Sequence, residues 1–418
     1  MSNSDPITAA RRTPVDSRPA VTVLAGFQPT ATAAVARLLQ IADPRLVSVG
    51  HDLSRVRDGV VRRVVRTAAE VLEDEAVTLM HGCVSCTLRE DVLPTLVRLS
   101  RARPGADIAL LLPRVVEPEA VAGACAHCEV DGRPVTDAVR FDSYVTVVDA
   151  EHLLADLTSA DDLRHRDLHA AADDDRAVAD VVTRQIEFAD TTVLWGGPAV
   201  EGYDLARAGV LLSRLAPWAT QVVVDASRRV DCTDLAARLR HTGRHNPRVP
   251  GMNGRALEGY AIAVHSPEPD CGVVSMLFEA RRPFHPGRLH AALSTLAAET
   301  LRGRGQLWLA TQPDTAIAYE SAGGGVGMGS LGHWLAALPA AHWAVASPDR
   351  RATADLAWDA AFGDRRTVLA FVGLDFAADS LAALLTDCLA TDRELGPGAR
   401  LPDPFADRFP LTVIDPED

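Results

Sequence analysis

The sequence has 418 residues, a formal net charge of −14, 47% hydrophobic residues and 23% charged residues. These values are typical of a soluble globular protein with two or three domains. No apolar run reaches the roughly 18 residues that a membrane span needs, and the acidic balance disfavours non-specific binding to nucleic acid, which requires basic surface.

Residues 1–19 are polar and lack the apolar core of a signal peptide, which predicts a disordered tail and a cytoplasmic location. The next part of the chain, residues 20–230, alternates strand-like and helix-like segments. The run AVTVLAGF (20–27) has the composition of a buried parallel strand, and TATAAVARLLQIA (30–42) that of a helix. Residues 60–72 fit either a strand pair or a helix. Further strands are expected at 45–53, 76–80, 106–116, 143–150, 190–196 and 220–226, and a helix at 89–102. This alternation predicts a doubly wound α/β domain with a mostly parallel sheet.

The alternation ends after residue 230. Residues 231–258 are rich in Gly, Pro and Arg towards their end, which predicts a linker or long loop. A second, smaller α+β domain is expected over residues 259–395, followed by a tail at 396–418. Its predicted strands lie at 272–284, 305–313 and 365–375, and its predicted helices at 286–300 and 379–390.

A strand, a glycine and a helix in succession are the layout of a phosphate-binding loop, which requires G-x-x-x-x-G-K-[ST]. Starting at Gly26, this chain reads GFQPTATA, so Ala31 replaces the second glycine, Thr32 the lysine and Ala33 the Mg²⁺-binding hydroxyl. The helix N-terminus still favours an anion. We therefore expect Gly26, Thr30 and Thr32 to form at most a vestigial nucleotide pocket, and we expect neither GTP nor Mg²⁺ as a cofactor.

Several stretches in a shared order resemble the CobW-type family of metal-handling GTPases. They are VTLMHGCVSCTLREDVL (77–93), YVTVVDAEHLL (144–154), RQIEFADTTVL (184–194), ARRPFHPGRLHAAL (280–293), GRGQLWLATQP (303–313) and AFVGLDFAADSLAALLTDCLAT (370–391). The resemblance implies a P-loop-NTPase-like domain followed by a CobW C-terminal domain, and it covers roughly residues 20–395.

The departures from that family concern nucleotide chemistry. Where the family has a Glu-Thr-x-Gly stretch, this chain has Leu111 at the glutamate position and Arg114 at the glycine position. Where an Asn-Lys-x-Asp guanine motif should follow DTTVL, the chain continues WGGPAVEG. With the Walker A lysine, the Mg²⁺ ligand and the guanine motif all absent, we predict a pseudo-GTPase and not an active enzyme.

This pattern is similar to an actinobacterial branch of the family that recruits a ribosome hibernation factor in response to zinc status. The resemblance implies a zinc-linked adaptor whose partner is a hibernation factor or another ribosome-associated protein. The alternative is a GTP-dependent zinc metallochaperone that retains weak nucleotide binding.

The cysteines decide what metal chemistry is available. Cys83 and Cys86 lie in the HGCVSC turn, where the family has a third cysteine and this chain has Ser85. Zinc favours four ligands in a closed site, so His81 is a further candidate ligand and the remainder must come from elsewhere. The alternatives are a buried, inert pair and a thiol with redox activity at a helix N-terminus.

Two further groups have ligand spacing. Cys125 and Cys128 lie in CAHC and are candidate zinc ligands, alone or with the first pair, although core burial explains them equally well. His165 and His169 are four residues apart and would share one face of a helix. A solvated charged insertion is the simpler interpretation of that stretch.

Overall fold

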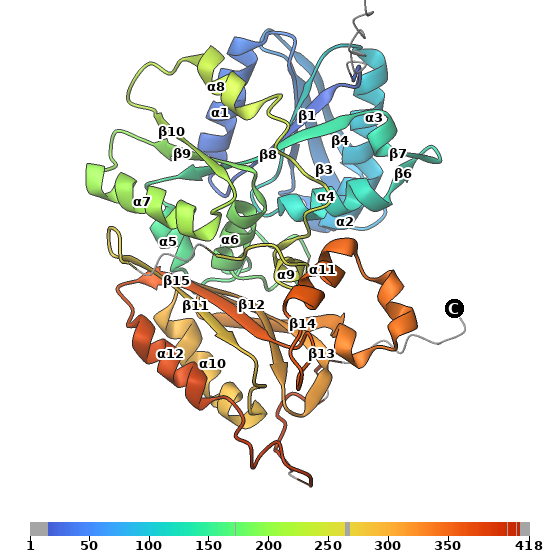
Figure 1. Ribbon diagram of the computed structural model, residues 1–418. Helices are drawn as coiled ribbons and strands as arrows, with labels where there is room; N and C mark the ends of the chain where they lie inside the picture. Colours follow the sequence, from blue (N-terminus) through green and yellow to red (C-terminus); the bar gives the residue numbers. More distant parts are fainter. Residues whose placement is uncertain (1–15, 172, 264–267, 399, 407, 410–418) are drawn as a thin grey trace, which may run out of the picture.

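The computed structural model describes residues 16–409 except 172, 264–267, 399 and 407. Its two main sheets belong to two domains that lie one above the other in Figure 1, the first coloured blue to yellow and the second orange to red. None of the helices in this part of the chain is long and apolar enough to span a membrane.

The first domain is built on an eight-stranded sheet with the order β10-β9-β8-β1-β5-β2-β3-β4. All neighbouring strands run parallel except β2–β3 and β3–β4. The strands are β1 (Ala20–Ala25), β2 (Val47–Asp52), β3 (Val60–Arg66), β4 (Val71–Thr78), β5 (Ile108–Leu111), β8 (Arg140–Asp149), β9 (Thr191–Gly196) and β10 (Thr220–Asp225). A small hairpin pairs β6 (Glu129–Val130) with β7 (Arg133–Pro134). Every residue of β1 is buried because helices cover both faces of the parallel region.

Helices pack on both faces of this sheet, as in other doubly wound domains. They are α1 (Pro29–Ala42), α2 (Val84–Cys86), α3 (Leu93–Ala102), α4 (Pro118–His127), α5 (Leu153–Leu157), α6 (Val178–Phe188), α7 (Gly202–Leu215) and α8 (Cys232–Leu239). The short helix α9 (Met252–Arg255) contacts the second sheet instead. A π-helical turn, η2 (Thr87–Val92), joins α2 to α3 just before Pro94. Short 3-10 turns lie at η1 (Val56–Asp58) and η3 (Val135–Asp137).

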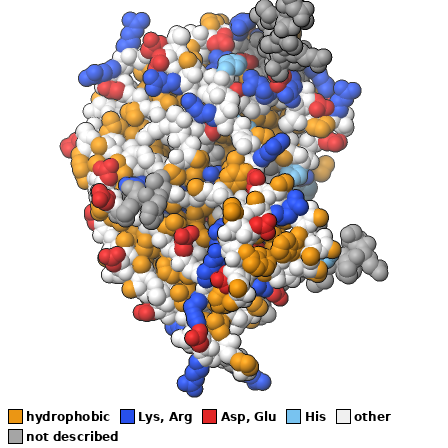
Figure 2. Space-filling model, in the orientation of Figure 1, with side chains coloured by type: hydrophobic (Ala, Val, Ile, Leu, Met, Phe, Trp, Pro, Cys, Tyr) orange, Lys and Arg blue, Asp and Glu red, His pale blue; other side chains and the backbone are white. Residues whose placement is uncertain are grey.

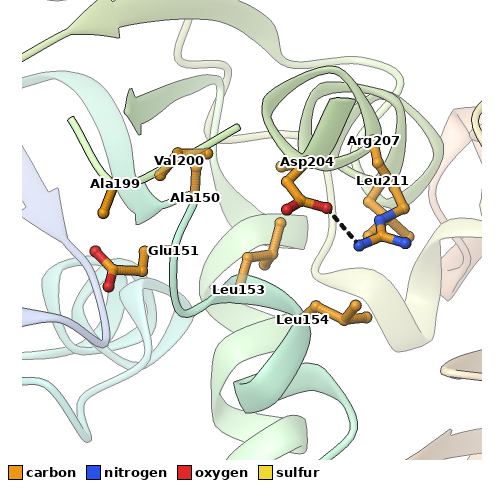
Figure 3. Close-up of a pocket in the computed structure, with 10 residues that line it drawn as sticks. Ala150, Glu151, Leu153, Leu154, Ala199, Val200, Asp204, Arg207 and Leu211 are labelled. Carbon is orange, nitrogen blue, oxygen red and sulfur yellow. Dashed lines mark hydrogen bonds and ion pairs between the residues drawn. The ribbon is translucent and has the colours of Figure 1, made fainter. Parts of the chain in front are cut away.

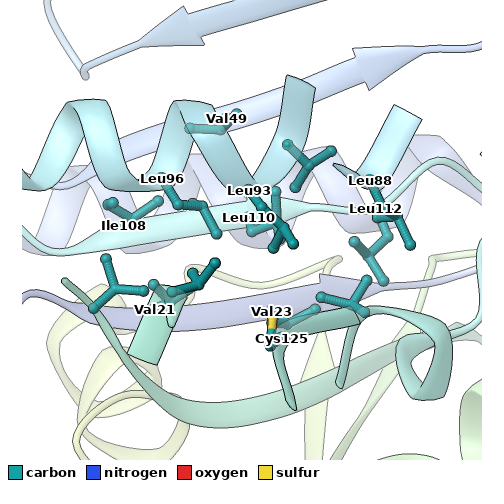
Figure 4. Close-up of a cluster of buried hydrophobic side chains, with 14 of the residues drawn as sticks. Val21, Val23, Val49, Leu88, Leu93, Leu96, Ile108, Leu110, Leu112 and Cys125 are labelled. Atoms are coloured by element: carbon teal, nitrogen blue, oxygen red, sulfur yellow. The ribbon is translucent and has the colours of Figure 1, made fainter. Parts of the chain in front are cut away.

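The hydrophobic core of the first domain lies on both sides of β1. On one side, β1, β2 and β5 pack against α3, η2 and α4, with Val23, Leu110, Leu93 and Leu88 among the buried side chains (Figure 4). On the other side, Leu24 packs with residues of α1 and α8. Burying a residue of this size contributes about 1.5–3 kcal/mol, so this two-sided core is what holds the carboxyl ends of the strands in place.

The second domain is a five-stranded antiparallel sheet with the order β11-β15-β12-β13-β14. The strands are β11 (Val273–Ala280), β12 (Arg302–Leu309), β13 (Gln312–Ala322), β14 (Gly325–His333) and β15 (Thr367–Leu374). Helices α10 (Pro286–Glu299) and α12 (Ala378–Asp387) cover one face, and α11 (Pro348–Leu356) lies beside the sheet (Figure 1). Two 3-10 turns, η4 (Leu335–Ala337) and η5 (Ala340–Val345), precede α11. The predicted α+β architecture is confirmed.

A buried ion cluster joins the two domains. Glu187 of α6 accepts hydrogen bonds from Arg302 Nε and Nη2 at 2.8 and 2.7 Å and also pairs with Arg304, both arginines lying on β12. Arg302 Nη2 lies 2.8 Å from Glu320 Oε1 on β13. The side chains of Glu187, Arg302 and Arg304 are each 1% exposed. The opposed charges therefore satisfy one another at the point where α6 meets the second sheet.

In one region the structure decides between two alternatives that the sequence left open, and in another it differs from the prediction. The ambiguous residues 60–72 form strands, since β3 and β4 pair as an antiparallel hairpin at the edge of the large sheet. The stretch 231–258, predicted as a linker or long loop, contains α8, which packs against α1 and extends the first domain. Its helix start is specified by Asp231, whose carboxylate accepts hydrogen bonds from the N–H groups of Thr233 and Asp234.

Candidate functional site

The loop after β1 joins a buried strand to α1, as a phosphate loop does, but lacks the residues that bind phosphate. A Cβ atom on Gly26 would lie 2.6 Å from the carbonyl oxygen of Val147 and closer still to Thr32 Oγ1, so contact with β8 explains this glycine. The Thr32 side chain is buried and its hydroxyl donates to the carbonyl of Gln28 at 3.3 Å. Thr30 is exposed on the first turn of α1. The three predicted nucleotide residues are adjacent, but the Thr32 hydroxyl is already engaged within the helix.

The crevice beyond the carboxyl ends of β1 and β8 is filled. This is the topological switch point of the sheet, where doubly wound domains bind ligands. The cavity between Phe27, Gln28 and residues 146–149 measures only about 20 Å³. Gln28 Nε2 donates to Asp156 Oδ2 at 2.8 Å, and Asp156 Oδ1 accepts from Arg166 at 3.1 Å. A space of this size holds about one water molecule. The loop positions Gly26, Pro29, Thr32 and Ala33 line a different and larger cavity.

A larger cavity of about 520 Å³ opens on the other side of β1, at the carboxyl ends of β1, β2 and β5. We call it the β2/β5 cavity. Gly26 and Thr32 contribute one wall, His51 and Asp52 the end of β2, and Arg114 the segment after β5. The segment 167–169 closes another side. Its walls are mostly apolar, and they are Pro29, Ala33, Gly50, Leu53, Val64, Leu111, Leu112, Pro113, Val115 and Leu168.

His51 and Asp91 form a buried pair beside this cavity. His51 Nε2 lies 2.6 Å from Asp91 Oδ2, and the two side chains are 1% and 4% exposed. Arg63 also pairs with Asp91 and continues the network to Glu73 at 3.2 Å. Although burial opposes it, the bonds from His51 and Arg63 hold the pKa of Asp91 below its ordinary value. The carboxylate is thus ionised and fixes the orientation of the imidazole.

Arg114 occupies the place that the sequence resemblance gives to a glycine in active GTPases. Its guanidinium lies over the Phe27 ring, 4.6 Å from the centroid. Within the described part of the chain its Nε is buried without a hydrogen-bond partner, and no carboxylate lies within 4.0 Å of its nitrogens. Burial lowers the pKa of Arg114, but a guanidinium remains protonated in proteins. Arg114 therefore contributes a positive charge to a lining that also contains Arg57, Asp52 and Asp167.

The first cysteine pair begins a helix next to this cavity. Cys83 is the N-cap of α2, and its Sγ accepts from the Cys86 N–H at 3.3 Å. Cys86 is buried and packs with Leu53, which also lines the β2/β5 cavity. The hydrogen bond with Cys83, burial and the nearby Glu90 carboxylate raise the pKa of the Cys86 thiol. The two sulfurs are thus adjacent and Glu90 is close, which gives the pair the elements of an incomplete zinc site.

The remaining candidate ligands are placed less favourably. Cys125 is buried in the core shown in Figure 4, and burial raises the pKa of its thiol to about 12. Cys128 packs at the edge of the same core, and His81 is exposed. The thiolate that zinc requires is therefore strongly disfavoured at Cys125. Within the described ranges, neither cysteine pair forms a metal-ligand cluster with a third His, Cys, Asp or Glu side chain whose ligand atoms all lie within 4.8 Å of one another.

The histidines at 165 and 169 do not share a helix face, because the segment around them forms turns. His165 Nδ1 accepts from the N–H of Asp162 at 3.1 Å, and His169 Nε2 lies 2.7 Å from Arg57 Nη1. The prediction that they could bind one ion on a helix is wrong. The spacing of four residues brings two side chains together only if the chain is helical.

One group of acidic residues was not identified from the sequence. Asp149 ends β8, and Glu151 and His152 follow it. The ligand atoms of these three residues lie within 4.8 Å of one another, which no other trio among the described residues matches. Glu151 also borders a cavity of about 190 Å³ whose far side carries the ion pair of Asp204 and Arg207 (Figure 3). The three residues stand close together in the sequence as DAEH (149–152), so their ligand spacing could have been noticed. They are partly or fully exposed, however, as solvated acidic groups usually are.

The surface carries no single basic face in the view of Figure 2, where arginines and acidic side chains are interspersed. This distribution, with the net charge of −14, gives no electrostatic footprint for the phosphates of nucleic acid on that face.

Comparison with known proteins identifies both domains. Residues 52–198 match the CobW/HypB/UreG nucleotide-binding domain, and residues 273–389 match the cobalamin synthesis protein cobW C-terminal domain. The first match begins after the altered loop at 26–33.

Two relatives cover most of the chain. It is 35% identical over 366 residues to a Mycobacterium tuberculosis protein named Zinc chaperone Rv0106, covering 83% of this chain and 84% of that protein. It is 28% identical over 341 residues to the zinc-regulated GTPase metalloprotein activator 1 of Dictyostelium discoideum, covering 80% and 70%. A solved structure of Zn(II)-bound YjiA GTPase from E. coli aligns over 89% of this chain and 99% of that chain, with 13% identity and a TM-score of 0.35. The chain therefore belongs to the CobW family, in which a CobW/HypB/UreG-type nucleotide-binding domain precedes a CobW C-terminal domain.

Proposed function

We propose that this protein is a zinc-linked pseudo-GTPase that acts as an adaptor and recruits a ribosome hibernation factor under zinc limitation. The observation that carries the loss of GTP turnover is the altered loop after β1. Thr32 stands where the motif has its phosphate-binding lysine, and Ala33 stands where it has the hydroxyl that binds Mg²⁺.

The zinc-linked part rests on the cysteine turn and on the relatives. Cys83 and Cys86 have adjacent sulfur atoms at the start of a helix, with Glu90 close by. Two thiolates fall short of a closed tetrahedral site, and an incomplete site favours exchange of the metal. One relative is named a zinc chaperone and another a zinc-regulated GTPase activator. The ribosome-associated partner follows from the resemblance to the actinobacterial branch.

A second candidate function is that of a GTP-dependent zinc metallochaperone. The names of the two relatives and the match to a nucleotide-binding domain favour it. It requires a phosphate chain to bind without the usual lysine.

The two candidates differ in GTP binding and phosphate release by the purified full-length protein, whereas both require zinc binding. Fluorescent GTP analogue with Mg²⁺ should show no saturable binding, and phosphate release should not exceed the buffer rate. Zinc per chain should be about one and should be lost in Cys83→Ser/Cys86→Ser, while Cys232→Ser, a cysteine remote from the turn, serves as the control.

Affinity capture from the native cell extract, with and without a zinc chelator, should then retain a ribosome-associated protein only when zinc is depleted. Saturable GTP binding with Mg²⁺-dependent hydrolysis would reject the adaptor in favour of the metallochaperone. Capture of the same partner with and without the chelator would contradict the proposed dependence on zinc.

A further inference from the structure

A second large cavity lies at the amino ends of β9 and β10, at the opposite edge of the first sheet from the altered loop after β1. It measures about 410 Å³, and the chain at 244–255, which ends in α9, forms much of its wall. We call it the α9 cavity. Helix α9 contacts α6 of the first domain and β12 of the second, so the cavity lies where the two domains meet (Figure 1). Its volume is within the usual range of roughly 300–1,000 Å³ for ligand pockets, and the adaptor function proposed above does not use it.

Arg255 is the buried cation of this cavity. The residue is 8% exposed, its guanidinium lies over the Trp218 ring, 3.9 Å from the centroid, and its Nε donates to the carbonyl of Ala261 at 3.1 Å. Among the described residues, Nη1 and Nη2 have no hydrogen-bond or carboxylate partner. Both atoms retain solvent contact, in contrast to the fully buried, unpartnered Nη1 of Arg302. The stacking and the Nε bond therefore fix a guanidinium whose two terminal nitrogens are free to donate, and Arg255 and Trp218 both line the α9 cavity.

A second arginine crowds Arg255. The guanidinium of Arg304 lies over the same Trp218 ring, 5.4 Å from the centroid. Burial, together with the Arg304 charge, lowers the pKa of Arg255 to about 10. Both guanidinium groups are still protonated at neutral pH, so two like charges are held close together. An anion beside Arg255 would relieve this repulsion.

The two acidic residues that line the cavity are engaged with other groups. Both carboxylate oxygens of Glu187 bond to arginines of β12, which belong to the second domain. Asp190 accepts from the N–H of Tyr144 at 2.8 Å and from the Thr191 hydroxyl at 3.2 Å, and burial raises its pKa to about 6. Neither carboxylate lies within 4.0 Å of Arg255. The positive charge of Arg255 is therefore not paired by the lining itself.

The rest of the lining adds a second cation and an apolar wall. Arg244 donates through Nη1 to the carbonyl of Arg238 at 3.0 Å and has no carboxylate within 4.0 Å in the described part of the chain. Burial lowers the pKa of His245, whose ring lies 4.6 Å from that of Tyr144, so this imidazole is neutral. Two cations beside apolar side chains form a lining that suits an organic anion. The apolar residues are Phe188, Ala189, Val249, Pro250 and Met252.

We propose that the α9 cavity binds a small organic anion, with its oxyanion group on Arg255 and Arg244 and its apolar body against the apolar wall. A carboxylate and a phosphate both offer a guanidinium two oxygens, and the test separates them. The Trp218 indole donates to the Glu187 carbonyl at 3.0 Å, and the Glu187 carboxylate holds the arginines of the second domain. A bound anion therefore lies next to the contact between the domains, and it stabilises the folded protein.

The test is isothermal titration of the full-length protein with benzoate and phenyl phosphate, which carry different anionic groups on the same apolar ring. At least one of them should bind saturably, and the tighter of the two identifies the anionic group. Benzamide lacks the charge, whereas acetate and inorganic phosphate lack the ring. Each of these three should bind more weakly than the tighter probe by about tenfold or more, the scale of a lost charge-assisted hydrogen bond or of a lost apolar contact.

Variants of the arginines locate the site. Arg255→Met should weaken the tighter probe by about tenfold or more, and the probe should raise the melting temperature of the native protein but not of this variant. Arg248→Met is the control, because Arg248 is an exposed arginine of the same segment that does not line the cavity, and its affinity should equal that of the native protein. Arg244→Met alters an exposed residue and should also weaken binding. It is the second variant if Arg255→Met does not fold.

Four results would overturn the assignment. They are no saturable binding of either probe at millimolar concentration, benzamide binding as tightly as the probes, native affinity in both Arg255→Met and Arg244→Met, and an equal loss in Arg248→Met. Inorganic phosphate or acetate that binds as tightly as the ring-bearing probes would show a site for a bare anion and would reject the organic ligand.

Discussion

Replacing Glu187 by glutamine tests whether the buried ion cluster holds the two domains together. Glu187 accepts from two arginines of β12, and all three side chains are 1% exposed. Although burial opposes ionisation, the Arg302 and Arg304 charges lower the pKa of Glu187. The arginines respond differently: burial lowers the pKa of Arg304, whereas the pKa of Arg302 is raised because it contacts both Glu187 and Glu320. Arg304 therefore depends most on Glu187.

The expected cost follows from that arrangement. Glutamine keeps the shape but removes the charge, which leaves Arg304 buried without a carboxylate, and a guanidinium cannot discard its proton. Breaking a buried pair by removing one partner costs about 3–5 kcal/mol, a large part of a stability of roughly 5–15 kcal/mol. Urea unfolding should show a midpoint lowered accordingly. Tryptophan fluorescence should report the interface, because the Trp218 indole donates to the Glu187 carbonyl at 3.0 Å.

Two further variants make the result interpretable. Asp74→Asn removes an exposed pair with Arg62 and should leave the midpoint unchanged, because exposed pairs are solvated in both states. Glu187→Gln/Arg304→Met should recover part of the loss, since the unpaired charge is gone. A loss below about 1 kcal/mol for Glu187→Gln, on the scale of an exposed pair, would refute the argument that this cluster stabilises the interface.

Three other predictions concern the first domain. Gly26→Ala should lower the melting temperature, because the added Cβ would lie 2.6 Å from the Val147 carbonyl oxygen. Nucleotide binding should not change. An unchanged melting temperature would contradict this close approach of the loop to β8. Burial raises the pKa of Asp190 from 3.8 to about 6, so the folded state binds its proton more tightly than the unfolded state. Stability should therefore fall by about 3 kcal/mol as pH rises from 4 through 6, and Asp190→Asn should flatten this dependence in urea titrations. Zinc binding at Cys83 and Cys86 should release protons and weaken as pH falls, because the Cys86 thiol has a raised pKa; calorimetry in buffers of different ionisation enthalpy measures this, and pH-independent binding would exclude the thiols.

Periodicity and composition were sufficient to predict the two domains. The run at 20–25 is apolar at almost every position, which is typical of a central parallel strand, and the structure buries all of it. The stretch 231–258 was harder, because Gly and Pro near its end obscured the amphipathic turn of α8 that begins at Cys232. Helix α8 is stabilised by packing against α1, which no local pattern reveals.

The candidate site was only partly predictable for a related reason. Single positions such as Ala31 and Thr32 report the loss of phosphate chemistry directly, since the missing groups are those that the chemistry needs. The β2/β5 cavity depends instead on residues separated by more than a hundred positions, such as His51 and His169. The partner of each histidine decides which ring nitrogen is free, and that choice exists only in the folded chain.

A last prediction separates the lost side chains from the backbone of the loop. If the missing lysine and hydroxyl alone prevent nucleotide binding, Thr32→Lys/Ala33→Ser should restore it, since both positions line the β2/β5 cavity of about 520 Å³. We expect this variant still to fail to bind GTP analogue with Mg²⁺, because Pro29 has no N–H to donate to a phosphate and Ala31 stands where the motif has a glycine. Adding Pro29→Ser and Ala31→Gly should then recover binding. Circular dichroism would check that each variant folds, since Thr32 is 3% exposed. Saturable binding in the two-residue variant would show that the loss of GTP binding rests on the lysine and the hydroxyl alone.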